Sequence, residues 1–224
     1  MSSLLNLLDS KTRKKITRRY LRDIKNILFY RSLAPKTHQL IYIDTFSIKF
    51  TIEQKPADGN FPFKRKHSAI IVSGNWDKKV YPIQQHLKIK ACELHFDKGL
   101  SWERSGAYKI MLDLIEKKGS FDNCTSKNDI KIRYERIDSL YSRIKSDKRI
   151  KSRLEIIPDN YREYGGILIH IGRNGEPIFG GSGCHRLSIA RALHLEKIPC
   201  ELGIVHPDAL NSSNYKKIIQ QNIT

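Results

Sequence analysis

Hydrophobic side chains recur along this chain at two different spacings, and each spacing predicts a different kind of element. Spacings of three and four residues predict helices, and the most regular pattern of this kind lies mid-chain. Ser126 and Asp129 stand just before it with the spacing of a capping box, so we expect a helix to begin there. The apolar face of this helix is formed by Ile130, Tyr134, Ile137, Tyr141 and Ile144.

Three further segments show helical spacing. Residues 1–33 combine it with many basic side chains, which predicts a basic amphipathic helix. A second helix has an apolar face formed by Ile83, Leu87, Ala91 and Leu94. A third has a face formed by Tyr108, Met111, Leu112 and Ile115. Two lysines and Gly119 follow the third segment, which is typical of a helix end.

Alternation with a period of two predicts strands. Within residues 39–53, four apolar side chains alternate with polar ones and predict one strand with one buried face; they are Phe46, Ile48, Phe50 and Ile52. Residues 56–62 predict a loop. Short buried strands are expected over residues 69–72 and 166–171. We therefore expect an α/β or α+β fold in which a small mixed sheet is wrapped by helices.

A glycine-rich loop between a predicted strand and a predicted helix carries the strongest functional signal. Glycines allow close approach of a ligand to the backbone, and free N–H groups at a helix start attract anions. Arg186 adds a forked donor suited to phosphate oxygens. We predict that phosphate binds to the loop residues Gly180, Gly181, Ser182, Gly183, Cys184, His185 and Arg186.

From residue 126 to 208 the chain resembles the ParB/sulfiredoxin superfamily. The resemblance rests on the order of helix, strand, turn, GGSGCHR loop, a helix containing Ile-Ala-Arg-Ala-Leu, and a closing strand at 198–202. In that superfamily the loop binds nucleotide phosphates, so the resemblance implies a nucleotide triphosphate, ATP or CTP, with or without Mg²⁺. His194 stands where the family usually has a left-handed glycine, a conformation that His tolerates less well.

The resemblance leaves three functions open. The leading one is a cytoplasmic nucleotide-binding protein that hydrolyses the nucleotide or transfers a phosphoryl group to a small substrate. The second is a DNA-associated protein, although the second motif and the DNA-reading helix pair of the partition branch are missing. The third is a sulfiredoxin-like thiol enzyme, because that branch has its catalytic cysteine in a Gly-Cys-His-Arg setting that matches residues 183–186.

The candidate catalytic residues are Cys184, His185 and Arg186. A thiol at a helix start beside an arginine is expected to be accessible and to have a lowered pKa. The length of the chain and the diversity of the family nevertheless argue against Cys184 as the nucleophile. His185 is expected to be neutral and to act as a general base, or to orient or contact phosphate.

No metal-ligand spacing is present in the sequence, so we expect no preformed metal site. Asp77 and Asp138 are candidate ligands for a Mg²⁺ ion that arrives with a nucleotide. Asp77 belongs to a Gly-Asn-Trp-Asp turn at residues 74–77. There, Trp76 is either a core side chain or a stacking wall at the mouth of a site.

The formal net charge of +18 indicates either a polyanionic partner or a solvated lysine-rich surface. Residues 1–33 concentrate this charge and are expected to pack at the domain edge, to lie on a membrane, or to contact nucleic-acid phosphates. If this arm shared a face with the loop, the DNA-associated function would be favoured. If the arm lay on the far side and the loop opened into a pocket, a small-molecule enzyme would be favoured.

The chain is expected to have four parts: the arm at 1–33, an α+β part at 34–125, the nucleotide-binding domain at 126–208, and a tail at 209–224. No flexible linker separates the two middle parts, so we expect them to share one core. The four cysteines show no Cys-x-x-Cys spacing, and no apolar run reaches transmembrane length. These features and the basic N-terminus predict a cytoplasmic protein.

Overall fold

The computed structural model describes residues 10–52 and 63–220. Its α-helices are α2 (Ser10–Tyr30), α3 (Leu87–Phe96), α4 (Ala107–Lys118), α5 (Lys127–Asp147), α6 (Arg153–Ile156), α7 (Cys184–Ala192) and α8 (Ser213–Gln220). Its strands are β1 (Leu40–Asp44), β2 (Phe50–Ile52), β3 (Val80–Pro82), β4 (Ile167–Ile171), β5 (Pro177–Phe179) and β6 (Lys197–Val205).

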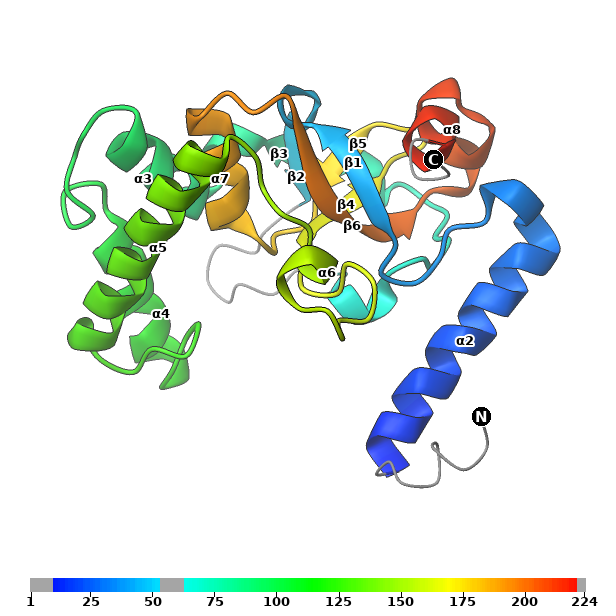
Figure 1. Ribbon diagram of the computed structural model, residues 1–224, viewed down its shortest axis with the longest axis horizontal. Helices are drawn as coiled ribbons and strands as arrows, with labels where there is room; N and C mark the ends of the chain where they lie inside the picture. The colour runs from blue at the N-terminus through cyan, green and yellow to red at the C-terminus, as the bar shows by residue number, and fades with distance from the viewer. Residues whose placement is uncertain (1–9, 53–62, 221–224) are drawn as a thin grey trace.

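The strands form one mixed sheet in the order β1-β6-β4-β5-β2-β3. The central strand β4 is parallel to β6 and antiparallel to β5, and β2 is parallel to β5. Every residue of β4 is buried. Figure 1 shows α3, α4, α5 and α7 gathered at one end of the molecule and α2 at the other. The expected mixed sheet of an α+β fold is confirmed, and these helices gather at its two ends.

The helix α5 forms where its pattern predicts. Ser126 Oγ accepts the N–H of Asp129, and the Asp129 carboxylate accepts the N–H of Ser126, so the capping box is present. Ile130, Tyr134, Ile137 and Ile144 are buried. α4 ends at Gly119, whose φ of 74° is the left-handed conformation that glycine accommodates best.

The apolar face predicted for the helix at residues 83–94 is partly wrong. Ile83 lies in a short 3₁₀ turn before the helix, and His86 caps the helix, which begins at Leu87. Leu87 is consequently exposed, whereas Ile89 and Cys92 are buried. The four-residue spacing from Ile83 to Leu87 therefore crosses the start of the helix, and the apolar pattern gave no sign of that boundary.

The single strand expected over residues 39–53 is instead two strands, which lie on opposite sides of the central strand β4. Asp44 accepts hydrogen bonds from the N–H groups of Phe46 and Ser47, and this cap stabilises a 3₁₀ turn that separates β1 from β2. Phe46 and Phe50 are exposed, contrary to the expected buried face. The expected strand at 69–72 is reduced to one bridge between Ile71 and Val205. The loop expected at 56–62 lies outside the described residues.

One hydrophobic core connects both middle parts of the chain. The first three strands come from residues 34–125 and the last three from residues 126–208, and they belong to the same sheet. Side chains from α3, α5, α7 and the sheet pack in one cluster. Within the described ranges, no helix is long and apolar enough to cross a membrane.

Candidate functional site

The glycine-rich loop is tied to β4 at both of its ends. The Gly180 N–H donates to the Leu168 carbonyl at 2.8 Å, and the Leu168 N–H donates to the Ser182 carbonyl at 3.0 Å. The N–H groups of Gly181, Ser182 and Gly183 have no hydrogen-bond partner in the part of the chain that the structure describes. Because these groups precede the first turn of α7, they form a set of free donors at the positive end of a helix.

Two of the glycines are required by the shape of this loop. Gly183 has a φ of 88°, and a Cβ atom there would lie 2.9 Å from the Cα atom of Ile167. At Gly180, a Cβ atom would lie 2.8 Å from Nε2 of the buried His170. A side chain at either position would therefore push the loop away from β4.

The loop opens into a cavity of about 940 Å³ between the start of α7 and the helices α3, α4 and α5. A volume of this size is in the range of small-molecule sites. Its lining includes three carboxylates, Asp113, Asp122 and Asp129, and apolar side chains from α4 and α5. The lining also includes six cationic side chains, Arg65, Lys88, Lys117, Arg133, Arg136 and Arg186. The cavity therefore carries an excess of positive charge.

A tight turn brings Asp122 into this cavity. Phe121 and Cys124 exchange backbone hydrogen bonds of 3.0 and 2.9 Å, and Asp122 and Asn123 between them have φ values of 50° and 62°. Both central residues are left-handed, as in a type I′ turn, and Asp and Asn tolerate this conformation better than most residues. Sequence reasoning missed Asp122, although the Asp-Asn pair after a helix end was the available signal.

Asp122 connects two of the cations. Its Oδ2 atom lies 2.7 Å from Lys88 Nζ and 3.0 Å from Arg133 Nη2. Burial opposes ionisation of Asp122, but Lys88 and Arg133 outweigh it and hold the pKa of the carboxyl below its usual value. The two cations are thereby oriented along one wall of the cavity.

Two neutral imidazoles face the same space. Burial and the nearby Lys88 lower the pKa of His185 to about 3 and that of His86 to about 4. The Nδ1 atom of His86 accepts the Ile89 N–H at 3.4 Å, so its proton resides on Nε2. The Nε2 atoms of both histidines are buried without a hydrogen-bond partner among the described residues. An unpartnered buried donor such as His86 Nε2 is costly, and an anion in the cavity would satisfy it.

Arg186 lies at the loop end of the cavity, as predicted, but one of its donors is engaged. Its Nη2 atom donates to the Gly165 carbonyl at 2.6 Å. Burial, together with the neighbouring Arg153 and Arg65, lowers the pKa of Arg186 to about 10. The guanidinium therefore stays charged at neutral pH and shares its surroundings with two further guanidinium groups. An anion would relieve their mutual repulsion.

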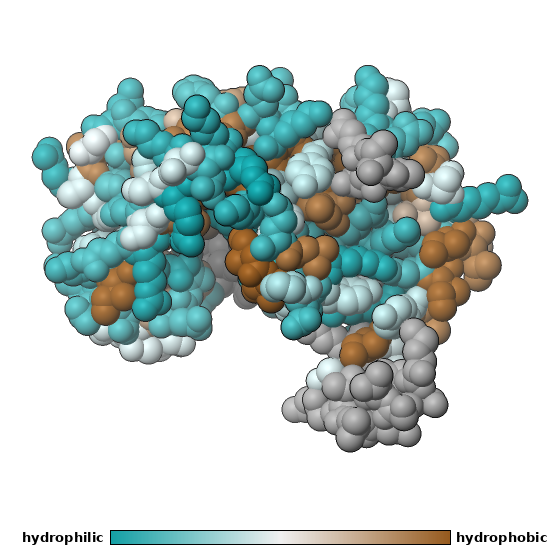
Figure 2. Space-filling view, in the orientation of Figure 1, coloured by the Kyte–Doolittle hydropathy of each residue, from teal (hydrophilic) through white to brown (hydrophobic). Residues whose placement is uncertain are grey.

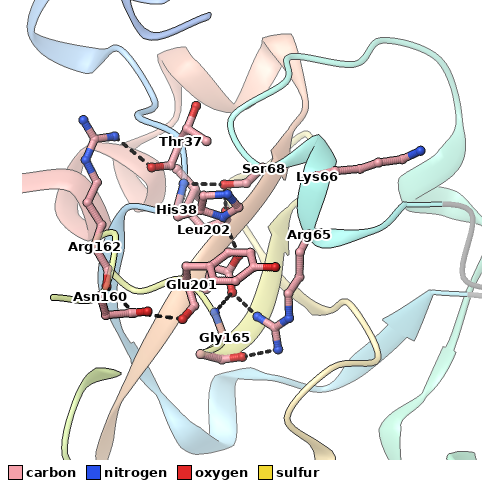
Figure 3. Close-up of polar contacts among 12 residues, drawn as sticks. Thr37, His38, Arg65, Lys66, Ser68, Asn160, Arg162, Gly165, Glu201 and Leu202 are labelled. Atoms are coloured by element: carbon pink, nitrogen blue, oxygen red, sulfur yellow. Dashed lines mark hydrogen bonds and ion pairs between the residues drawn. The ribbon is translucent and has the colours of Figure 1, made fainter. Parts of the chain in front are cut away.

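A buried network beneath the cavity holds Arg65 in place, as Figure 3 shows. Arg65 pairs with Glu201 and also donates to the Gly166 carbonyl at 2.7 Å. Glu201 is fully buried, lies 2.7 Å from His38 Nδ1 and accepts the Gly165 N–H at 3.0 Å. Nothing in the sequence pattern identified Arg65 or Glu201, because they come from segments 136 residues apart.

The prediction that the Cys184 thiol is accessible and has a lowered pKa is wrong. Its side chain is only 7% exposed and belongs to the hydrophobic core, together with Cys92 and Cys200. Burial raises the pKa of the Cys184 thiol, and the nearby Lys88 and Arg133 do not compensate for it. The thiol therefore points into the packing between α7 and α3 and is not the acidic, accessible group that its position at a helix start suggested.

The two carboxylates considered as Mg²⁺ ligands are engaged elsewhere. Asp77 is buried and accepts hydrogen bonds from Arg173, and Asp138 accepts from Trp102 and His95. Trp76 packs edge-on against His170. Residues 74–77 are therefore a structural turn. No group of three or more potential metal ligands occurs within the described ranges.

The basic arm and the loop do not share a face. Helix α2 lies at the opposite end of the molecule from the cavity helices α3, α4 and α5 (Figure 1). His194 has a φ of 51°, which confirms the left-handed position expected for it. A scan against protein-family models and searches of curated proteins and of solved structures found no match for this chain.

Proposed function

We propose that this protein binds a nucleotide triphosphate, ATP or CTP, with the phosphates on the loop at residues 180–186. The observation that carries the proposal is the coincidence of free backbone donors, a cationic cavity and the unpartnered donor of His86. The resemblance of residues 126–208 to the ParB/sulfiredoxin superfamily supports the same ligand.

In this proposal the phosphates lie against the N–H groups of Gly181, Ser182 and Gly183, with Arg186 and Lys88 as cationic partners. Apolar side chains from α4 and α5 line the rest of the cavity and suit the nucleobase or a second substrate. Fixed donors and cations stabilise charge on a phosphoryl group as it is transferred, so hydrolysis or transfer to a small acceptor fits the site. The cavity carboxylate Asp122 is paired with Lys88 and Arg133, so it is not free to hold a Mg²⁺ ion brought by the nucleotide.

The position of α2 supports a small-molecule function over the DNA-associated one. The arm concentrates basic residues, but it lies at the end of the molecule away from the cavity. The arm and the loop therefore do not present one continuous basic face to a duplex. The burial of Cys184 also weakens the sulfiredoxin-like alternative, since that chemistry needs an accessible thiolate.

A thermal-shift panel tests the proposal. Purified protein is heated with ATP, CTP, GTP, ADP or tripolyphosphate, each with and without Mg²⁺. A nucleotide at a hundredfold excess over its Kd stabilises the folded state by about 2.7 kcal/mol. We expect one nucleoside triphosphate to raise the unfolding temperature more than the diphosphate or tripolyphosphate does. If no nucleotide shifts the unfolding temperature, the proposal is wrong.

A further inference from the structure

The helix α2 packs on the domain through polar side chains. Asn26 donates to the carbonyls of Pro35 and Ala69 at 2.8 and 2.9 Å. Asp23 accepts from the N–H and hydroxyl of Thr37 and pairs with Arg162 at 2.6 Å. Asp23 and Asn26 are only 5% and 6% exposed, so the buried side of this helix is largely hydrophilic.

The apolar side of α2 consequently faces outward. At 3.6 residues per turn, five large side chains fall within about a third of the helix circumference. They are Tyr20, Leu21, Ile24, Ile27 and Leu28, and their exposed fractions range from 46% to 74%. Figure 2 shows apolar side chains over the C-terminal half of this helix. A helix normally buries such a stripe, but no residue in the described ranges covers this one, so it is open to a partner.

Basic side chains run beside this apolar stripe. Residues 10–30 contain eight lysines and arginines and one acidic residue, Asp23, which is already paired with Arg162. Lys14, Arg18 and Lys25 are exposed, lie next to Leu21 around the helix, and make no ion pair within the described ranges. The outward surface of α2 therefore combines an apolar stripe with an uncompensated row of cations.

Charge and hydrophobicity together select the occupant of this surface. A second copy of α2 would bring two rows of cations together, and their repulsion disfavours it. Nucleic acid would satisfy the cations but leave the apolar stripe in water. The surface of an anionic bilayer satisfies both, because apolar side chains enter the acyl boundary while cations stay at the headgroups.

We propose that α2 lies in the plane of an anionic membrane surface, with Leu21, Ile24 and Leu28 inserted and Lys14, Arg18 and Lys25 at the lipid phosphates. The polar contacts of Asp23 and Asn26 attach only the inner face of α2 to the rest of the protein, so the helix docks on the membrane without unfolding. The cavity at the other end of the molecule stays accessible from water. This inference does not depend on the proposed nucleotide site.

Vesicle co-sedimentation of the full chain tests this inference. Vesicles of phosphatidylcholine with 30% phosphatidylserine are compared with pure phosphatidylcholine vesicles, at about 50 and 500 mM salt. We expect binding to the anionic vesicles, weakened by salt. The triple variant K14Q/R18Q/K25Q should lose on the order of a hundredfold in partition, because each cation near such a surface contributes about fivefold.

The apolar stripe is tested separately with I24D/L28D. This variant should lose at least tenfold in partition at low salt, whereas the matched control I156D, at a residue 51% exposed outside α2, should bind as the original chain does. Circular dichroism and the unfolding temperature check that each variant is folded. Equal binding by I24D/L28D and the original chain would overturn the proposal, as would absence of binding to anionic vesicles.

Two further outcomes would also overturn it. Light scattering that shows a dimer of the original chain and a monomer of I24D/L28D would assign the stripe to a second copy. The original chain could instead bind a mixed-sequence DNA duplex and fail to bind vesicles. If K14Q/R18Q/K25Q then lost DNA binding and I24D/L28D kept it, the cations would be assigned to nucleic acid.

Discussion

Arg186 is anchored to the carbonyl of Gly165 through a 2.6 Å hydrogen bond from Nη2. This bond fixes the guanidinium at the end of the cavity before any ligand binds, while its other donors stay near the loop. Pre-orientation of this kind reduces the ordering cost of binding, so the arginine is suited to hold a phosphate in one position.

The first prediction concerns this arginine. Arg186→Ala should weaken nucleotide binding by about 10- to 100-fold, because a charge-assisted hydrogen bond contributes roughly 1.5–3 kcal/mol. Arg186→Lys should recover only part of the loss, since lysine lacks the planar fork. Isothermal titration calorimetry measures the effect. Arg191→Ala, in the same helix but outside the cavity lining, is the control. Undiminished affinity in Arg186→Ala would contradict the proposed phosphate site.

A second prediction concerns Cys184. Because burial raises the pKa of this thiol, alkylation by iodoacetamide should be slow and should have a midpoint above that of an ordinary thiol. Mass spectrometry of peptides after timed alkylation distinguishes it from Cys92 and Cys200, which should also react slowly because they are buried. Cys184→Ser should keep nucleotide binding. Fast labelling at neutral pH, or loss of turnover with binding intact, would restore the thiol-enzyme hypothesis.

A third prediction follows from two buried histidines. Burial lowers the pKa of His86 to about 4 and that of His170 to about 3, whereas the unfolded chain titrates near the ordinary value of about 6.5. The unfolded state therefore binds more protons below pH 6.5, and stability must fall as the pH falls from about 6.5 towards 4. Two such groups contribute up to about 3 kcal/mol per pH unit.

Urea unfolding at pH 7, 6, 5 and 4 measures this dependence. His86→Gln removes one titrating group and keeps an acceptor for the helix cap, so its stability should vary less steeply with pH. A free energy of unfolding that stays constant between pH 6.5 and 4.5 would show that these imidazoles are not buried in their neutral form.

A fourth prediction concerns Asp77, which supports the turn at residues 74–77. Hydrogen bonds from Arg173 lower the pKa of Asp77 to about 2 against the opposing effect of burial. This carboxylate therefore contributes stability above its unfolded pKa of about 3.8 and loses it as the pH falls towards 2. Asp77→Asn should cost about 1–2 kcal/mol at pH 6, after allowance for solvent screening.

Guanidinium chloride unfolding of Asp77→Asn measures this cost at pH 6 and pH 3. The difference from the original chain should shrink at the lower pH, because the carboxyl of the unfolded original chain, with a pKa of about 3.8, is then mostly protonated. Asp97→Asn changes a carboxylate that has no ion pair within the described ranges and serves as the control. A difference that is the same at both pH values would exclude the ion pair as its cause.

The sequence by itself determined the elements whose signals are local. The capping box at Ser126 and Asp129, the apolar spacing that follows it, and Gly119 at a helix end depend on residues within a few turns of one another, and α4 and α5 follow them. The position of the glycine loop between a strand and a helix was predictable for the same reason. The left-handed conformation of His194 was expected only from the family resemblance, and it is observed.

Only the tertiary structure decided what surrounds each side chain. Cys184 stands at a helix start, where the dipole favours a thiolate, but packing against α3 buries it and the cost of desolvation outweighs the dipole. The strand expected at 39–53 is divided by the turn that Asp44 caps, and the sheet places its two halves on opposite sides of β4. The burial of Cys184 and the placement of β1 and β2 in the sheet depend on residues that are distant in the sequence.

The cavity and the outward face of α2 were likewise decided by tertiary packing. Asp122, Arg65 and His86 meet the loop only because separate elements converge on the start of α7. On α2, the spacing of apolar residues predicted an amphipathic helix but not which side would be buried. The inner face of α2 lies against backbone groups of distant residues, and Asp23 and Asn26 satisfy those groups, which leaves the apolar side outward.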